Sequence, residues 1–132
     1  MKILVTGVAG QLGFDVCKRL TALGIEHCGV DKDDFDLTDG DAVMAYVKVC
    51  APDAIIHCAA YTNVDKAETQ PEVCAAVNGM GTLNMVRAAL AVDAKLIYVS
   101  TDYVFSGEGS QPFEVNDPRQ PKYIYGLTKV QG

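Results

Sequence analysis

Short apolar runs alternate with longer segments of mixed polarity along the chain. Strand-like runs of apolar and β-branched residues occupy 2–6, 26–31, 35–37, 54–59 and 95–100. The run at 54–59 is apolar almost throughout, which is typical of a strand covered on both faces. Strands that alternate with helices at this spacing predict an α/β fold, with a doubly wound parallel sheet in the strand order 3-2-1-4-5.

Four helices are predicted between and after these runs, from apolar positions three and four residues apart. They span 12–23, 41–50, 71–92 and the residues from about 123 onward. Pro71 suits the first turn of the third helix, along which Val77, Met80 and Leu90 follow the helical period. No internal repeat or interdomain linker interrupts the pattern, so residues 1–132 are expected to form one domain.

Composition and charge narrow the class of protein. With 49% hydrophobic and 21% charged residues, the chain has the composition of an ordinary globular protein. A net charge of −6 argues against nonspecific nucleic-acid binding, which needs clustered Lys and Arg. No segment approaches the roughly 20 apolar residues that span a bilayer, and the first residues form a strand, not a secretory signal. We therefore expect a cytoplasmic protein with no nucleic-acid or membrane partner.

The cysteines and histidines carry no pattern of a metal site. The five cysteines are odd in number and form no CxxC pair, which favours reduced, buried thiols in a cytosol over disulfides. His27 and His57 have no ligand-like spacing to one another or to a cysteine, so we expect no metal and interpret both as structural. The six aspartates between 31 and 41 are interpreted mainly as a solvated loop.

A glycine-rich turn joins the first strand to the first helix. Gly7, Gly10 and Gly13 stand in a GxxGxxG spacing, one residue wider in its first gap than the GxGxxG fingerprint. Gly7 would permit a tight turn, Gly10 would let the backbone approach a pyrophosphate, and Gly13 would let helix and strand pack closely. The phosphates would meet free N–H groups at the positive end of the helix dipole. This context predicts a dinucleotide-binding Rossmann domain over 1–132.

Asp31 follows at the end of the second strand, where a ribose-binding carboxylate is expected. Its charge would accept hydrogen bonds from the adenosine ribose and repel a 2′-phosphate, which favours NADH. The neighbouring Lys32 could soften the exclusion of NADPH or simply be solvated. The choice between NADH and NADPH stays open.

Tyr125 and Lys129 form a YxxxK pair, whose members share one face of a helix. A nearby ammonium would stabilise the phenolate and lower the tyrosine pKa. Such a tyrosine could donate a proton to a carbonyl oxygen while hydride arrives at the carbon. Thr101 and Asp102 follow the fifth predicted strand, where ligands of open α/β sheets bind. A local turn is the alternative for these two, and the role of Tyr103 stays open.

The three glycines, Thr101 and the Tyr125–Lys129 pair together resemble the extended short-chain dehydrogenase/reductase family. Three stretches narrow the resemblance to its dTDP-4-dehydrorhamnose reductase branch: CAAYTNVDKAE at 58–68, STDYVFSG at 100–107 and YGLTK at 125–129. The resemblance covers the whole chain. It implies reduction of the C4 ketone of dTDP-4-dehydro-L-rhamnose to dTDP-L-rhamnose, with NADPH or NADH.

The resemblance also implies a role for individual residues. Tyr125 would be the proton donor, Lys129 would hold the nicotinamide ribose and tune Tyr125, Thr101 would hydrogen-bond the reacting oxygen, and Asp102 would contact the sugar. Asn78 matches a helix asparagine that, in the wider family, supports a water or backbone near the tyrosine. The implied cofactor-binding set, which includes the catalytic pair, is Gly7, Gly10, Gln11, Leu12, Gly13, Asp31, Asp36, Leu37, Ala59, Ala60, Tyr61, Val99, Tyr125 and Lys129.

Two departures and two alternatives accompany this resemblance. Cys58 replaces an asparagine that is frequent before the Ala-Ala pair, and the family continues past the position of Gly132 with a C-terminal substrate domain. Residues 1–132 alone are therefore expected to be inactive. An epimerase or dehydratase of nucleotide sugars is one alternative, and a non-catalytic regulatory subunit, such as that of methionine adenosyltransferase, is another. A homodimer is one option for the assembly.

Overall fold

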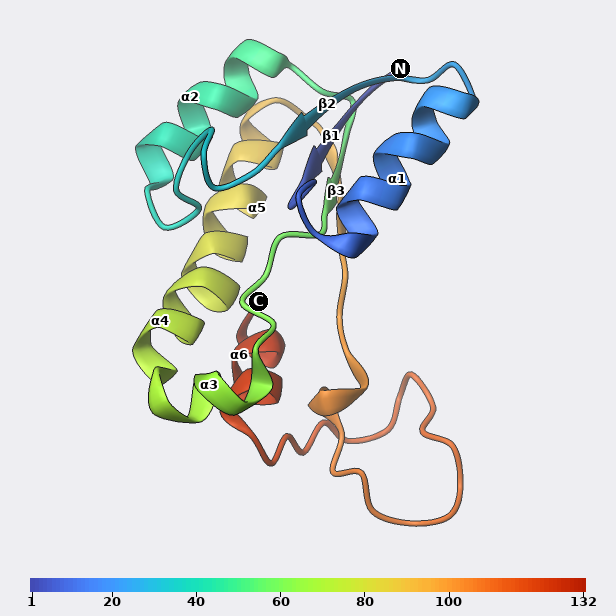
Figure 1. Ribbon diagram of the computed structural model, residues 1–132, viewed down its shortest axis with the longest axis vertical. Coiled ribbons are helices and arrows are strands. Elements are labelled where there is room, and N and C mark those ends of the chain that lie inside the picture. Colours follow the sequence, from blue (N-terminus) through green and yellow to red (C-terminus); the bar gives the residue numbers. More distant parts are fainter.

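A parallel four-stranded sheet forms the centre of the protein. The computed structural model describes residues 1–132. Its strands are β1 (Lys2–Thr6), β2 (Glu26–Val30), β3 (Ala54–His57) and β4 (Lys95–Tyr98), in the order β2-β1-β3-β4 (Figure 1). Every neighbouring pair is parallel, so the predicted doubly wound α/β fold is confirmed.

The edge strand expected at 35–37 is wrong, and only the other four strands keep the predicted order. The backbone of this segment closes a turn, because the Asp39 N–H donates to the Asp36 carbonyl at 3.1 Å. The Asp36 carboxylate also accepts from the Thr38 N–H at 2.8 Å. Phe35 packs against Tyr46, with ring centroids 5.2 Å apart. Side-chain packing thus holds 35–37 against α2 while its polar groups satisfy one another locally.

Helices cover both faces of the sheet. They are α1 (Gln11–Ala22), α2 (Gly40–Cys50), α3 (Val64–Thr69), α4 (Pro71–Ala75), the π-helical η1 (Ala76–Gly81), α5 (Thr82–Ala91), the 3₁₀ turn η2 (Asp102–Val104) and α6 (Ile124–Gln131). In Figure 1, α1 lies on one face, α2 and α5 lie on the other, and α3, α4 and α6 gather beyond the carboxyl ends of the strands. No helix is long and apolar enough to cross a membrane.

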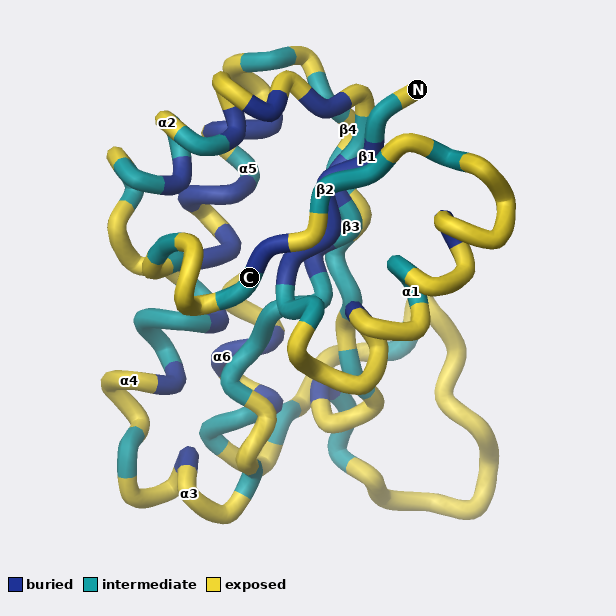
Figure 2. The backbone as a smooth tube through the Cα atoms, turned by 45° about the horizontal axis from the view of Figure 1, so that its top comes forward, coloured by how far each residue is buried: buried dark blue, intermediate teal, exposed yellow.

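The core divides into two layers because successive strand side chains point to opposite faces. On β1, Leu4 joins a nine-residue cluster with α2 and α5 that includes Val43 and Met85. Its neighbours Ile3 and Val5 pack instead with Leu20 of α1 and its surroundings. Figure 2 shows the buried residues concentrated along the strands and on the sheet-facing sides of the helices.

The predicted helix boundaries hold except in the third helix. The predicted 71–92 segment begins with Pro71, as expected, but a π-helical turn at 76–81 divides it. The extra residue in that turn rotates the buried face. Met80 and Leu90 are therefore exposed, whereas Asn78 and Met85 are buried.

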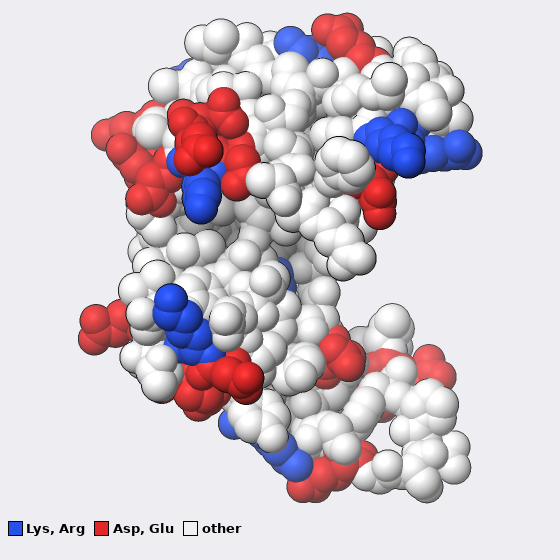
Figure 3. All heavy atoms as spheres, in the orientation of Figure 1, with Lys and Arg blue, Asp and Glu red and all other residues white.

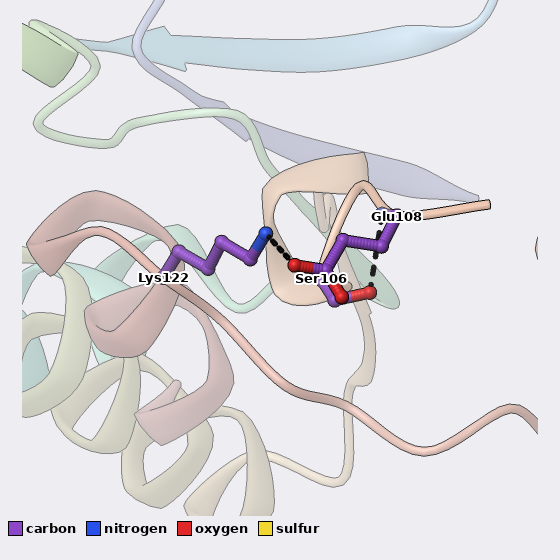
Figure 4. Close-up of polar contacts among 3 residues, drawn as sticks. All are labelled: Ser106, Glu108 and Lys122. Carbon is purple, nitrogen blue, oxygen red and sulfur yellow. Dashed lines mark hydrogen bonds and ion pairs between the residues drawn. The ribbon is translucent and has the colours of Figure 1, made fainter.

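A long loop connects η2 to α6 and projects from the body of the protein (Figure 1). Lys122 closes its base by donating to the Glu108 carboxylate at 2.6 Å, and the Glu108 N–H donates to the Ser106 hydroxyl at 3.2 Å (Figure 4). Phe105 and Phe113 stack, with centroids 4.8 Å apart. These contacts give the loop a defined start and end around an exposed middle.

Candidate functional site

An open groove of about 870 Å³ lies at the carboxyl ends of β1, β2 and β3. The surface in Figure 3 is densely acidic where the β2–α2 segment approaches it, in keeping with the predicted solvated aspartates. Eleven residues predicted to contact a dinucleotide line the groove: Gly7, Gly10, Gln11, Leu12, Gly13, Asp31, Asp36, Leu37, Ala59, Ala60 and Tyr61. Segments that lie more than fifty residues apart in sequence thus share one surface.

The glycine-rich turn leaves a ring of free donors at this groove. Gly10 is the N-cap of α1, and no side chain caps the helix. The first helical bond is from the Phe14 N–H to the Gly10 carbonyl, so the N–H groups of residues 11–13 have no partner in the chain. A side chain at Gly13 would collide with the Gly7 carbonyl, so the missing Cβ is what lets α1 pack this close. Free N–H groups at a helix N-terminus fit a pyrophosphate.

Asp31 is already engaged with the protein. Its carboxylate accepts from the Ala9 N–H at 2.8 Å and from the Lys32 N–H at 2.9 Å. The first bond fastens the glycine-rich turn to the end of β2. Asp31 therefore shapes the turn as well as facing the predicted ribose position, which the sequence alone did not reveal.

A second cluster forms where β4 ends, and it contains the predicted chemistry. The Thr101 side chain lies close enough to the Tyr125 phenol to affect the pKa of that phenol. The Thr101 hydroxyl also donates to the Asp102 carboxylate at 3.0 Å. The Tyr103 ring meets the Tyr125 ring edge-on at 5.6 Å. At Gly126, a Cβ would collide with the Tyr103 carbonyl, so this glycine allows α6 to approach η2.

Lys129 does not lower the pKa of Tyr125 as expected. Burial is the largest effect on the phenol and raises its pKa above 10.0, while the hydrogen bond with Thr101 acts in the opposite direction. The Lys129 ammonium is used elsewhere: it donates to the Val99 carbonyl at 2.7 Å and lies 4.0 Å from the centroid of the Tyr98 ring. Burial lowers the pKa of Lys129 to about 8.

Hydrogen bonds of Asn78 join the groove to the second cluster. Its amide accepts from the Tyr61 N–H at 2.8 Å and donates to the Tyr61 carbonyl at 3.1 Å. The same amide donates to the Thr128 hydroxyl at 3.0 Å, beside Lys129. Thr128 in turn donates to the Tyr125 carbonyl at 2.9 Å. The predicted support of the tyrosine region by this asparagine thus has a concrete geometry.

Val99, Thr101, Asp102, Tyr125 and Lys129 do not line the groove itself but group at β4 and α6, next to it. Sequence reasoning missed several lining residues, among them Ala9, Phe35 and Thr62. Thr62 could have been found, because it continues a predicted run past the end of a strand. Phe35 was not predicted to line the groove because the segment 35–37 was expected to be an edge strand.

The comparisons with known proteins agree with this arrangement. The chain is 40% identical over 129 residues to a dTDP-4-dehydrorhamnose reductase of Streptomyces griseus, covering 98% of this chain and 42% of that protein. It superposes on the dTDP-4-dehydrorhamnose reductase of Clostridium acetobutylicum with a TM-score of 0.96 and 40% identity, over 99% of this chain and 47% of the other. The chain thus spans less than half the length of these proteins.

Two further solved structures contain a dinucleotide. The dTDP-4-dehydrorhamnose reductase of Bacillus anthracis in complex with NADP matches with a TM-score of 0.94 and 36% identity, over 98% of this chain and 46% of that one. The UDP-glucose 4-epimerase of Thermus thermophilus in complex with NAD matches with a TM-score of 0.89 and 28% identity, over 98% and 48%. The sequence profile of the RmlD substrate binding domain family matches residues 1–132. Because this match covers the whole chain, the chain belongs to the RmlD substrate binding domain family.

Proposed function

We propose that the protein reduces the C4 ketone of dTDP-4-dehydro-L-rhamnose to dTDP-L-rhamnose, with NADPH or NADH as reductant. Residues 1–132 are its NAD(P)-binding Rossmann domain. The observation that carries the proposal is the packing of Tyr125 on α6 against Tyr103 of η2, beside Thr101 at the end of β4 and next to a groove with free helix N–H groups. The named relatives support the choice of substrate.

The bound dinucleotide would supply hydride to the carbonyl carbon, and the side chains of this chain would manage the oxygen. Tyr125 donates its phenolic proton to that oxygen, giving the alcohol. The phenol is protonated at neutral pH, as in any tyrosine, and its raised pKa makes it a weaker acid, so its proton transfers only as negative charge develops on the carbonyl oxygen. On substrate binding, the Thr101 hydroxyl turns its proton from the Asp102 carboxylate, its acceptor in this structure, to the reacting oxygen, and Asp102 is then free to contact the sugar.

The groove residues hold the cofactor in this proposal. The N–H groups at the start of α1 bind the pyrophosphate. Asp31 faces the adenosine ribose, Asp36 and Leu37 flank the adenine, and residues 59–61 line the middle of the cofactor. Lys129, fixed by the Val99 carbonyl, reaches the nicotinamide ribose.

Binding and turnover test separate parts of the proposal. Titration with NADH and NADPH, followed by nucleotide fluorescence, should show reversible binding. In a version of the protein that includes the C-terminal substrate domain, addition of dTDP-4-dehydro-L-rhamnose should then consume the reduced nucleotide in step with formation of the alcohol. If neither dinucleotide binds, the assignment of the groove as the cofactor site is wrong. If a dinucleotide binds but is consumed only with a different sugar nucleotide, the assignment of the substrate is wrong.

A nucleotide-sugar epimerase is the second candidate, because the Thermus thermophilus epimerase shares the fold at 28% identity. An epimerase regenerates its cofactor and holds it tightly, whereas a reductase must exchange it every turnover. A nucleotide that co-purifies with the protein and survives dialysis would favour the epimerase. Nucleotide that exchanges freely would favour the reductase.

The proposal extends to location and assembly. Five free cysteines are compatible with a reducing, cytoplasmic compartment. A homodimer is supported by the exposed apolar side chains of Leu83 and Leu90 on α5. Sedimentation at several protein concentrations would measure the assembly, and a concentration-independent monomer would exclude the dimer.

A further inference from the structure

His57 is a fully buried histidine that the proposed chemistry does not use. It is the last residue of β3, and its side chain is 1% exposed. No carboxylate contacts it. Its ring lies between the glycine-rich turn, which it contacts through Thr6, and the helices that support Tyr125 and Lys129, which it contacts through Thr82.

The first contact reaches the glycine-rich turn. The Thr6 hydroxyl and His57 Nδ1 are 2.7 Å apart. The same hydroxyl accepts from the Ala59 N–H at 3.1 Å. The Thr6 hydroxyl has no other acceptor within hydrogen-bond distance, so its single proton is satisfied only when it points to His57 Nδ1, which then accepts. Thr6 directly precedes Gly7, and Ala59 lines the groove.

The second contact reaches the π-helical turn. His57 Nε2 lies 3.5 Å from the Thr82 hydroxyl, which donates its own proton to the Asn78 carbonyl at 2.7 Å. Thr82 can therefore only accept from His57, so the imidazole proton belongs on Nε2. The donors run in one direction, from Thr6 through His57 and Thr82 to the backbone of Asn78. In such a chain each bond polarises the next.

The third contact reaches the lysine. The His57 and Tyr98 rings stack with centroids 6.1 Å apart, and the Lys129 ammonium lies over the same Tyr98 ring. The Tyr98 hydroxyl donates to the Lys129 carbonyl at 3.2 Å. Every buried side-chain nitrogen and oxygen has a hydrogen-bond partner. Removing one member of this layer would therefore leave the polar atom of a neighbour without its partner.

We propose that His57 is a positioning residue: as a neutral imidazole with its proton on Nε2, it holds the glycine-rich turn and the Asn78–Lys129 support at a set distance and orientation. The inference rests on the proposed function, because only in that function must the glycine-rich turn and the Asn78–Lys129 support be held in register for one cofactor. A cationic His57 would lose its acceptor for Thr6 and would face the Lys129 ammonium without a carboxylate between them. In agreement, burial and Lys129 lower the pKa of His57 to about 4.

The first test reads the tautomer directly, in the protein without nucleotide. The chain contains two histidines, so a long-range proton–nitrogen correlation spectrum at pH 7 shows two imidazoles. The His27→Asn variant identifies the signals of His57. We expect Nδ1 of His57 as an unprotonated acceptor nitrogen and Nε2 as a protonated one. A proton on Nδ1, or a cationic ring, would overturn the proposal.

The second test compares two variants that differ in what they can bond. His57→Gln offers an amide that can replace one or both ring contacts, whereas His57→Leu fills the space and can replace neither. We expect NADH affinity to fall about tenfold in His57→Leu and to stay within about threefold in His57→Gln. The side-chain amide signals of Asn78 should move in His57→Leu only. Wild-type affinity and unmoved Asn78 signals in a folded His57→Leu would refute the bridge.

The outcomes also separate this inference from the proposed function. If wild-type protein shows the Nε2–H tautomer but binds no dinucleotide, the proposed function fails and the bridge stands as a structural feature only. If it binds dinucleotide but carries the proton on Nδ1, the bridge fails alone. Should both variants unfold, the wild-type tautomer still decides.

Discussion

At the scale of single residues, the structure assigns the titratable groups different tasks from those their spacing suggests. The Tyr125–Lys129 spacing favoured a phenolate stabilised by an ammonium. In the folded protein, Lys129 bonds the Val99 carbonyl and Tyr125 meets Thr101, while burial raises the pKa of the phenol. A raised pKa makes the phenol a weaker acid, so the structure without cofactor and substrate does not supply the lowered pKa that the spacing predicts.

Replacing Tyr125 by Phe tests its role as the acid. The variant removes the proton that reaches the carbonyl oxygen but keeps the ring packed against Tyr103. Turnover of the sugar nucleotide should fall by roughly 100-fold or more, within the usual contribution of general acid catalysis. NADH affinity, measured by fluorescence, should stay within a factor of about two. Unchanged turnover in Tyr125→Phe would remove Tyr125 from the mechanism.

Asp31→Ala tests how the end of β2 selects the cofactor. The variant removes a negative charge from the predicted ribose position and the bond that fastens Ala9. The ratio of NADPH to NADH affinity should rise by about tenfold, because a 2′-phosphate no longer meets a carboxylate. Asp33→Ala is the matched control, since Asp33 is exposed and makes no hydrogen bond in the loop. An equal loss of affinity for both nucleotides would mean that Asp31 acts only on the turn.

At the scale of secondary-structure elements, close approaches of backbone decide how the site is assembled. Helix α6 touches η2 where Gly126 meets the Tyr103 carbonyl, and this contact brings Tyr125 to Thr101. Helix α1 touches its own turn at Gly13 in the same way. The π-helical turn at 76–81 aims Asn78 inward, where its amide bonds both Tyr61 and Thr128. A π-turn at this position is in keeping with the frequent placement of such turns at functional sites.

Gly126→Ala should push α6 away from η2. The added methyl group collides with backbone, which cannot move as easily as a flexible side chain, so we expect a loss of about 1–3 kcal/mol in the free energy of unfolding. Urea unfolding followed by circular dichroism measures it. Gly79→Ala is the matched control, because a methyl group there meets only the Gln131 side chain, at 3.4 Å or beyond. A loss as large in Gly79→Ala would show that the Tyr103 contact is not the cause.

At the scale of the whole molecule, stability is linked to the neutral state of the buried His57. Its pKa is about 4 in the folded protein, against 6.5 for an ordinary histidine. Between these values the unfolded chain binds a proton that the folded one does not, so the stabilising contribution is complete above pH 6.5 and is lost as pH falls toward 4. The buried neutral His57 thus makes the folded protein less stable at acid pH.

The free energy of unfolding should be about 2 kcal/mol lower at pH 5 than at pH 7 on account of His57 alone. Denaturant unfolding at both values measures the difference. In His57→Gln, which has no group titrating in this range at that position, the same interval should change the free energy by about 2 kcal/mol less. An identical pH dependence in both proteins would assign the acid sensitivity to the carboxylates.

Local sequence determined most of the elements and the chemistry that each one carries. Short apolar runs mark the strands, Pro71 begins a helix where expected, and Gly7, Gly10 and Gly13 mark the turn that lines the groove. These features follow from short-range rules of sterics and periodicity, which the chain obeys within a few residues. The segment 35–37 was misjudged because an apolar pair can pack on α2 without joining the sheet.

Only the tertiary structure decided which of these groups act on one another. Lys129 bonds Val99, 30 residues away and just past the end of β4, and His57 bonds Thr6, 51 residues away at the end of β1. The π-helical turn contains Asn78, whose side-chain amide hydrogen-bonds both Tyr61 and Thr128. A buried polar atom takes the partner that the packed chain brings within reach, and this partner follows from the fold as a whole and not from spacing along the sequence.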